Sequence, residues 1–268
     1  MKHYLYAFLI GMAGLVWACG RDTMTPKTGA LALQFDHVAG AAPLALGNAT
    51  YTNAAGEPFT VSRLDYFVSN IRLRRADGSE YVIPQDSSYF LVRASDEASR
   101  TLRLNNLPEG PYTGLSFMVG VDSLRSVSGI EQRKGVLDPG LSHTSGMYWD
   151  WNTGYIFLKL EGTSPAVAPD ATGQRNYRFH VGLFGGYRAR TLNNLRTVTL
   201  DFGGQSVSAT TGPVSAVQIR ADVLKIFDGP KRLSLAQKSD IMVSPESADV
   251  ANNYARMFSF RQITPLER

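Results

Sequence analysis

Thiols are almost absent from this chain, and imidazoles are scarce. Its 268 residues include one cysteine and four histidines. A single cysteine excludes a disulfide scaffold and every site built on paired thiolates, such as zinc fingers, iron–sulfur clusters and dithiol redox motifs. A metal site in this protein would therefore have to be built from its few histidines.

Runs of like charge and catalytic motifs are also missing. The 27 basic and 23 acidic residues are interspersed and give a formal net charge of +4. No run of five like charges is present, so nothing is typical of a nucleic-acid-binding arm. There is no phosphate-binding Walker loop, no GxSxG elbow and no HExxH helix. We therefore expect neither an enzyme nor a nucleic-acid partner.

Residues 1–18, just before Cys19, have the layout of a secretory signal. Lys2 and His3 precede an apolar stretch over residues 4–16, which is too short to span a membrane. The string Val16-Trp17-Ala18-Cys19 resembles a bacterial lipobox, although Trp17 fits that pattern poorly. We expect residues 1–18 to be a signal peptide, Cys19 to be lipidated, and residues 19–29 to form a tether to the outer membrane. A plain signal peptide that leaves a free thiol is the alternative.

From Ala30 onward, short β-type runs alternate with turn residues. Leu31, Leu33 and Phe35 alternate with polar or small residues, which is the period of a strand with one buried face, and His37 falls on that face. Similar runs follow at residues 63–74, 81–83, 89–92, 102–104, 112–119, 155–160, 177–181, 196–202 and 216–223. Many short strands with few helical periods predict one all-β domain over residues 30–268, an antiparallel β-sandwich. Short helices are expected near residues 123–129 and over residues 248–258, with Ser247 as the cap of the second.

Two local features stand out from this background. Trp149 and Trp151 lie within eight residues that also hold two tyrosines, and on a strand the two indoles would share one face. Such a cluster is usually part of a core; a sugar-stacking surface is the second interpretation. After the signal, the remaining histidines are His37, His143 and His180. A lone strand histidine is usually a hydrogen-bonded core residue, so composition alone does not make any of them a ligand.

These residues also carry a family resemblance. Residues 147–162 (MYWDWNTGYIFLKLEG) and 33–37 (LQFDH) resemble the MbnP-like copper-binding family. Further similar segments run through most of the chain, from about Leu31 to Phe227, at residues 43–44, 51–70, 119–123, 137–139, 179–182 and 224–227. At residues 241–246 (IMVSPE) the chain departs from the family pattern of a histidine and a cysteine there, which argues against a second metal site or a C-terminal disulfide.

The resemblance implies a copper-binding protein of the periplasm or outer membrane, used in copper acquisition or homeostasis. It places the copper ligands at His37 and His180, with Trp149 or Trp151 oxidised to kynurenine by a MauG-like di-haem partner enzyme. A TonB-dependent outer-membrane transporter is a further expected partner. Imidazole suits copper, and no thiolate is needed. His143 does not match the motif and is expected at the surface.

Two other functions remain open from the sequence. A glycan-binding lipoprotein would expose Trp149, Trp151 and Tyr155 as a stacking platform. A structural envelope lipoprotein would bury them and bind neither sugar nor copper. The distance between the imidazoles of His37 and His180 discriminates between a shared copper site and these alternatives.

Overall fold

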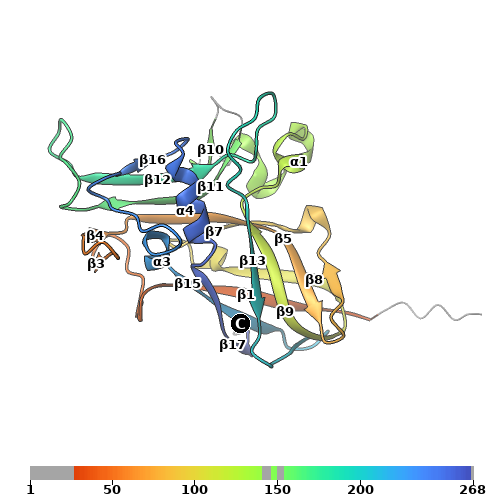
Figure 1. Cartoon of the computed structure of the whole chain (residues 1–268). Coiled ribbons are helices and arrows are strands. Elements are labelled where there is room, and N and C mark those ends of the chain that lie inside the picture. Colours follow the sequence, from red (N-terminus) through yellow and green to blue (C-terminus); the bar gives the residue numbers. More distant parts are fainter. Residues whose placement is uncertain (1–26, 141–145, 150–153, 267–268) are drawn as a thin grey trace, which may run out of the picture.

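Two β-sheets packed face to face dominate the structure (Figure 1). The computed structural model describes residues 27–140, 146–149 and 154–266. The predicted all-β sandwich in one domain is confirmed. Among the described residues, no helix is long and apolar enough to cross a membrane.

The small sheet has five strands, in the order β17-β15-β1-β2, with β8 also paired to β1. Its strands are β1 (Thr28–Ala39), β2 (Ala42–Pro43), β8 (Thr101–Pro108), β15 (Ser215–Asp222) and β17 (Phe258–Pro265). Strand β1 therefore begins two residues before the expected domain start at Ala30. It lies parallel to β15, with His37 opposite Ala221. This parallel pair joins segments that are far apart in the sequence and adds to the antiparallel pairs that we expected.

The large sheet has ten strands, and its central path runs β13-β9-β5-β11-β12-β16. The path consists of β13 (Arg196–Asp201), β9 (Gly110–Val119), β5 (Arg63–Arg75), β11 (Gly154–Thr163), β12 (Asn176–Gly182) and β16 (Asp240–Ile241). The side members are β6 (Glu80–Val82), β7 (Tyr89–Arg93), β10 (Tyr148–Trp149) and β14 (Val207–Ala209). Strands β5 and β6 form a hairpin around Asp77 and Gly78. A separate two-stranded sheet joins β3 (Thr50–Thr52) to β4 (Pro58–Thr60).

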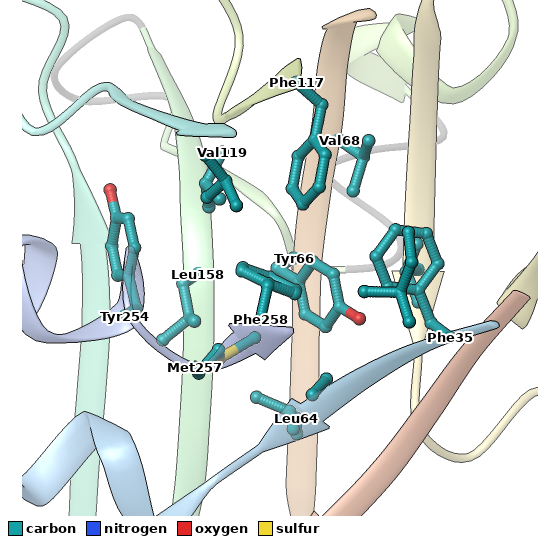
Figure 2. Packing of buried hydrophobic residues seen from close by; sticks show 14 of the residues in the cluster. Phe35, Leu64, Tyr66, Val68, Phe117, Val119, Leu158, Tyr254, Met257 and Phe258 are labelled. Carbon is teal, nitrogen blue, oxygen red and sulfur yellow. The ribbon is translucent and has the colours of Figure 1, made fainter. Parts of the chain in front are cut away.

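The main core fills the space between the two sheets. Phe35 of β1 makes edge-to-face contacts with Tyr66 of β5, Phe117 of β9 and Phe258 of β17, with ring centroids 5.9, 5.9 and 6.0 Å apart (Figure 2). On β5, Leu64, Tyr66 and Val68 face this core because side chains alternate along a strand. The residues between them therefore point to the other side of the large sheet, which we call its outer face.

The helices of the described residues are short. They are α1 (Ser123–Ser126), α3 (Leu224–Phe227) and α4 (Glu246–Tyr254), with 3-10 turns η1 (Gln85–Ser87), η2 (Ala98–Arg100), η3 (Ile130–Gln132) and η4 (Gly135–Leu137). Both predicted helical regions are present, but Ser247 is not the cap of the second. It lies inside α4, fully buried, where its Oγ is 3.0 Å from Nδ2 of Asn194. The end of the expected helix, at Phe258, instead begins β17, because this segment pairs with β15.

Candidate functional site

His180 lies on the outer face of the large sheet. In the strand register, His180 of β12 is opposite Lys159 of β11, which is opposite Asp65 of β5. Their neighbours Phe179, Leu158 and Tyr66 face the main core, so these three polar side chains share the other face. The His180 side chain is 12% exposed, which leaves it within reach of a small ligand at the surface.

Glu161 holds the His180 imidazole. Its Oε1 is 2.6 Å from Nε2 of His180, and this hydrogen bond is the main reason that the pKa of Glu161 is lowered. Because Nε2 is engaged by Glu161, Nδ1 is the nitrogen that remains for another partner. The sequence analysis missed Glu161. Its signal is a charged residue two positions after Lys159 in an otherwise apolar strand, within the motif at residues 147–162.

Lys159 and its neighbours form an ion cluster beside this pair. The Nε of Arg63 is 2.7 Å from Oδ2 of Asp65, a carboxyl that is almost fully buried and whose pKa burial raises. Burial, with Arg63 nearby, lowers the pKa of Lys159, whose Nζ donates to the carbonyl oxygen of Gly146. The buried ammonium therefore attaches the Gly146 end of the tryptophan segment to the outer face.

Trp149 packs against the same face. Its ring lies directly over Gly182, two residues after His180: a Cβ added at Gly182 would be 2.7 Å from Cζ3 of Trp149. Gly182 leaves the space that the indole occupies. The ring belongs to a second apolar cluster on the outer face, with Phe67, Leu91, Val121, Leu137, Met147, Tyr155, Ile156, Phe157, Leu183 and Phe184.

The burial of this cluster bears on the sugar-binding alternative. Trp149 is 7% exposed and Tyr155 is not exposed at all, so neither offers a flat open surface to a sugar ring. Trp151, the third member of that platform, lies outside the described residues, as do His143 and Cys19. The described aromatic residues therefore form a small core, which is the usual role of such a cluster.

His37 lies on the opposite side of the large sheet from His180. It points from β1 into the space between the sheets, where its Nε2 is 3.1 Å from the hydroxyl of Tyr66. It is 7% exposed, and its Nδ1 has no hydrogen-bond partner. The structure therefore does not bring His37 and His180 together, because Tyr66 faces the main core and Lys159, beside His180, faces away from it.

Burial lowers the pKa of His37 from 6.5 to about 4, and the charge of Arg100 adds to this shift. The unfolded chain takes up this proton below pH 6.5 and the folded chain does so only near pH 4, so stability is lost as the pH falls through this window. The full effect is about 3 kcal/mol, from the linkage between pKa and folding free energy.

We expect urea unfolding to show a larger loss of stability between pH 7 and pH 4.5 for the native chain than for His37→Gln. Carboxylates contribute equally to both proteins, so the difference isolates His37. Equal losses would show that His37 is not held neutral by its surroundings.

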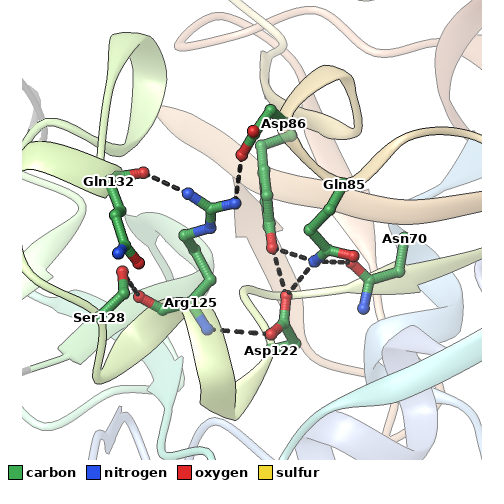
Figure 3. A network of polar contacts seen from close by, with 8 residues as sticks. Asn70, Gln85, Asp86, Asp122, Arg125, Ser128 and Gln132 are labelled. Carbon is green, nitrogen blue, oxygen red and sulfur yellow. Dashed lines mark hydrogen bonds and ion pairs between the residues drawn. The ribbon is translucent and has the colours of Figure 1, made fainter.

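A second polar group surrounds α1 (Figure 3). Asp122 accepts the backbone N–H of Arg125 at 3.0 Å and so caps the helix, while its other oxygen accepts from Tyr89 and Gln85. The Arg125 guanidinium donates to Asp86 and to the carbonyl oxygen of Gln132. A cavity of about 840 Å³ lies alongside, lined by Asp86, Tyr89, Arg125, Glu131, Gln132 and residues 134–137. The groups in this network satisfy one another, which indicates a role in joining α1 to η1 and η3.

Comparison with known proteins shows the family to which the chain belongs. Residues 28–244 match the model of the MbnP family. The chain belongs to the MbnP family. Its fold is similar to that of MbnP from Methylosinus trichosporium, with a TM-score of 0.54 and 19% sequence identity, over 90% of this chain and 100% of that one. The comparison with curated protein sequences gives no match.

Family membership confirms the resemblance on which the sequence analysis relied. The residues of this chain that match the family model include the strands that carry His37, Trp149, Glu161 and His180. Among the described residues, however, no group of three or more histidine, cysteine, aspartate or glutamate side chains is arranged to hold a metal ion. His180 and Glu161 form a histidine–carboxylate pair on the outer face, with Nε2 and Oε1 2.6 Å apart.

Proposed function

We propose that this protein binds copper in the cell envelope, and that His180 is a copper ligand. The proposal is supported by membership in a family whose resemblance implies copper binding and by one observation, the hydrogen bond between His180 and Glu161. A histidine that ligates a metal almost always donates its second ring N–H to a carboxylate, a backbone carbonyl or a water, which fixes the orientation of the ring. His180 has this arrangement before any metal is bound.

The residues around His180 fit a copper ion in charge and chemistry. Imidazole is a good copper ligand in either common oxidation state, and no thiolate is required. Glu161 would orient Nδ1 of His180 outward, and Trp149 would shield the site from one side because its ring covers Gly182. His37 has no part in this site, because it lies on the other side of the large sheet.

We extend the proposal to the oxidation of a tryptophan and to the partner enzyme that carries it out. Trp149 or Trp151 would be oxidised to kynurenine by a MauG-like di-haem partner, and the ketone and aromatic amine of the product would add groups able to bind a metal. Cys19 would carry the lipid anchor that keeps the protein at the outer membrane, beside a TonB-dependent transporter. The protein would act in copper acquisition or homeostasis and not as an enzyme.

Copper content tests the ligand assignment. The protein would be purified from its native host and its copper measured by mass spectrometry. We expect His180→Ala to lose the bound copper, and Glu161→Gln to weaken copper affinity about 10- to 100-fold, as outer-shell partners commonly do. His37→Gln is the matched control and should retain copper.

Retention of copper by His180→Ala would contradict the site. If neither the native chain nor the control binds copper, the structural role is the better account of the protein. The intact mass of the native protein tests the modification separately: kynurenine replaces one carbon atom of tryptophan by one oxygen, and an unmodified peptide over residues 146–155 would reject it.

A further inference from the structure

Tyr66 and His37 form a buried pair in the main core that the copper site does not use. The hydroxyl of Tyr66 is 3.1 Å from Nε2 of His37, and the two rings meet edge to face with centroids 5.7 Å apart. Tyr66 is not exposed to solvent at all, and His37 is 7% exposed. Water therefore has little access to the phenol–imidazole hydrogen bond.

The hydrogen-bond partners of the pair indicate which ring nitrogen of His37 carries a proton and where the phenol hydrogen of Tyr66 points. If Tyr66 donates to Nε2, then His37 carries its proton on Nδ1, and one donor is left without a partner. If Nε2 donates to Tyr66 instead, both the phenol hydrogen and the Nδ1 lone pair are left without partners. Each unmet buried polar group costs about 1–3 kcal/mol. The first arrangement is therefore the stable one, and the phenol proton points at the lone pair of the imidazole.

Other buried tyrosines lack such a base. The hydroxyls of Tyr112 and Tyr177 donate to the backbone carbonyls of Pro108 and Thr60, at 2.7 and 2.8 Å. Those of Tyr155 and Tyr254 also donate to backbone carbonyls, of Leu137 and Asn194. A peptide carbonyl cannot take a proton, whereas a neutral imidazole can. Within the described part of the chain, Tyr66 is thus the fully buried tyrosine whose phenol hydrogen has a base to receive it.

We propose that Tyr66 and His37 form a buried redox couple. A high-potential one-electron oxidant takes an electron from the phenol, the O–H bond of Tyr66 breaks, and the proton forms a bond with Nε2 of His37. The products are the one-electron reduced oxidant, a neutral tyrosyl radical and an imidazolium ion. Return of the electron moves the proton back, so the step is reversible and no atom leaves the protein.

The proton transfer is what makes the step feasible in a core. An oxidised phenol is a far stronger acid than an imidazolium ion, and a phenol cation without a proton acceptor would be a buried unpaired charge. The acceptor is already at hydrogen-bond distance, so no side chain needs to move. Because imidazolium is itself disfavoured by burial and by Arg100, the radical state lies high in energy and returns its electron readily. The pair is suited to brief storage of an oxidising equivalent.

A row of aromatic rings runs from the surface to Phe67, the residue that follows Tyr66 on β5. The half-buried ring of Tyr148 lies 5.2 Å from that of Tyr155, which lies 5.5 Å from Phe67. Phe67 follows Tyr66 on β5 and faces the outer side of the large sheet. The row ends one residue from Tyr66, on the opposite face of β5.

Photochemical oxidation tests the couple without copper or any partner protein. The metal-free protein would be oxidised by photogenerated tris(bipyridine)ruthenium(III) and frozen for electron paramagnetic resonance. In a Tyr187→Phe background, which removes an exposed phenol, we expect the spectrum of a neutral tyrosyl radical that Tyr66→Phe lowers and the matched control Tyr177→Phe retains. His37→Gln keeps a hydrogen-bond acceptor but no base, so the radical yield should fall at least about tenfold, as expected when a positioned base is lost.

The outcomes separate the couple from ordinary core packing. A tryptophan radical in the native chain, or a tyrosyl signal unchanged by Tyr66→Phe, would overturn the proposal. An unchanged yield in His37→Gln would overturn the role of the imidazole, and this variant serves as the test if Tyr66→Phe does not fold. Since no copper is present, the result is independent of the copper site.

Discussion

Replacing Phe35 by alanine should destabilise the protein by about 3–5 kcal/mol, the range measured when a buried phenylalanine is truncated in a core. Phe35 is 1% exposed and contacts three other aromatic rings contributed by both sheets. Its removal leaves a cavity where the two sheets meet and also loses edge-to-face contacts, each worth about 0.5–1.5 kcal/mol. Urea unfolding followed by circular dichroism measures the change.

Phe35→Leu and Leu124→Ala calibrate this result. Leucine fills much of the space and should cost less than alanine, and it reports on the site if Phe35→Ala does not fold. Leu124 is 81% exposed on α1, so its truncation should change stability by less than about 0.5 kcal/mol. A cost of Phe35→Ala no larger than that of Leu124→Ala would mean that the two sheets do not pack through this ring.

Gly182→Ala should disturb the proposed copper site without touching a ligand. The added Cβ would lie 2.5 Å from the carbonyl oxygen of Tyr155 and 2.7 Å from Cζ3 of Trp149, so both the β11 backbone and the indole have to move away from β12. Overpacking of this kind costs about 1–3 kcal/mol. We expect copper affinity to fall together with stability, and Trp fluorescence to shift as the ring becomes exposed.

Gly212→Ala is the matched control for this variant, because a Cβ at Gly212 has open space around it. It should leave stability, fluorescence and copper binding unchanged. If Gly182→Ala behaves like the control, the ring of Trp149 does not lie on Gly182. If it is destabilised but retains native copper affinity, Trp149 belongs to the outer-face cluster alone and has no role at the metal.

The two histidines that the family resemblance implies as copper ligands, His37 and His180, have different surroundings. His180 is held by a carboxylate at the surface of the large sheet, which suits the copper ligand that we propose. His37 is buried against a phenol between the sheets, which suits a proton acceptor that stays in place. The copper and redox proposals therefore concern separate faces of the large sheet and can be tested separately.

The sequence by itself determined the fold class and the local order of its strands. Alternation of apolar and polar residues predicted the β-type runs, and it already assigned Phe35 and His37 to one face of their strand. The aromatic string at residues 147–162 pointed to the family, and membership is confirmed. These features depend on residues that are close together in the sequence, so the sequence alone can predict them.

Only the tertiary structure decided which strands lie together and which face each histidine occupies. The parallel pairing of β1 with β15, the bond between Ser247 and Asn194 and the contact of His37 with Tyr66 all join segments that are distant in the sequence. Alternation tells which residues share a face but not which face meets the core. That choice depends on how the two sheets bury their apolar sides, and it separates His37 from His180.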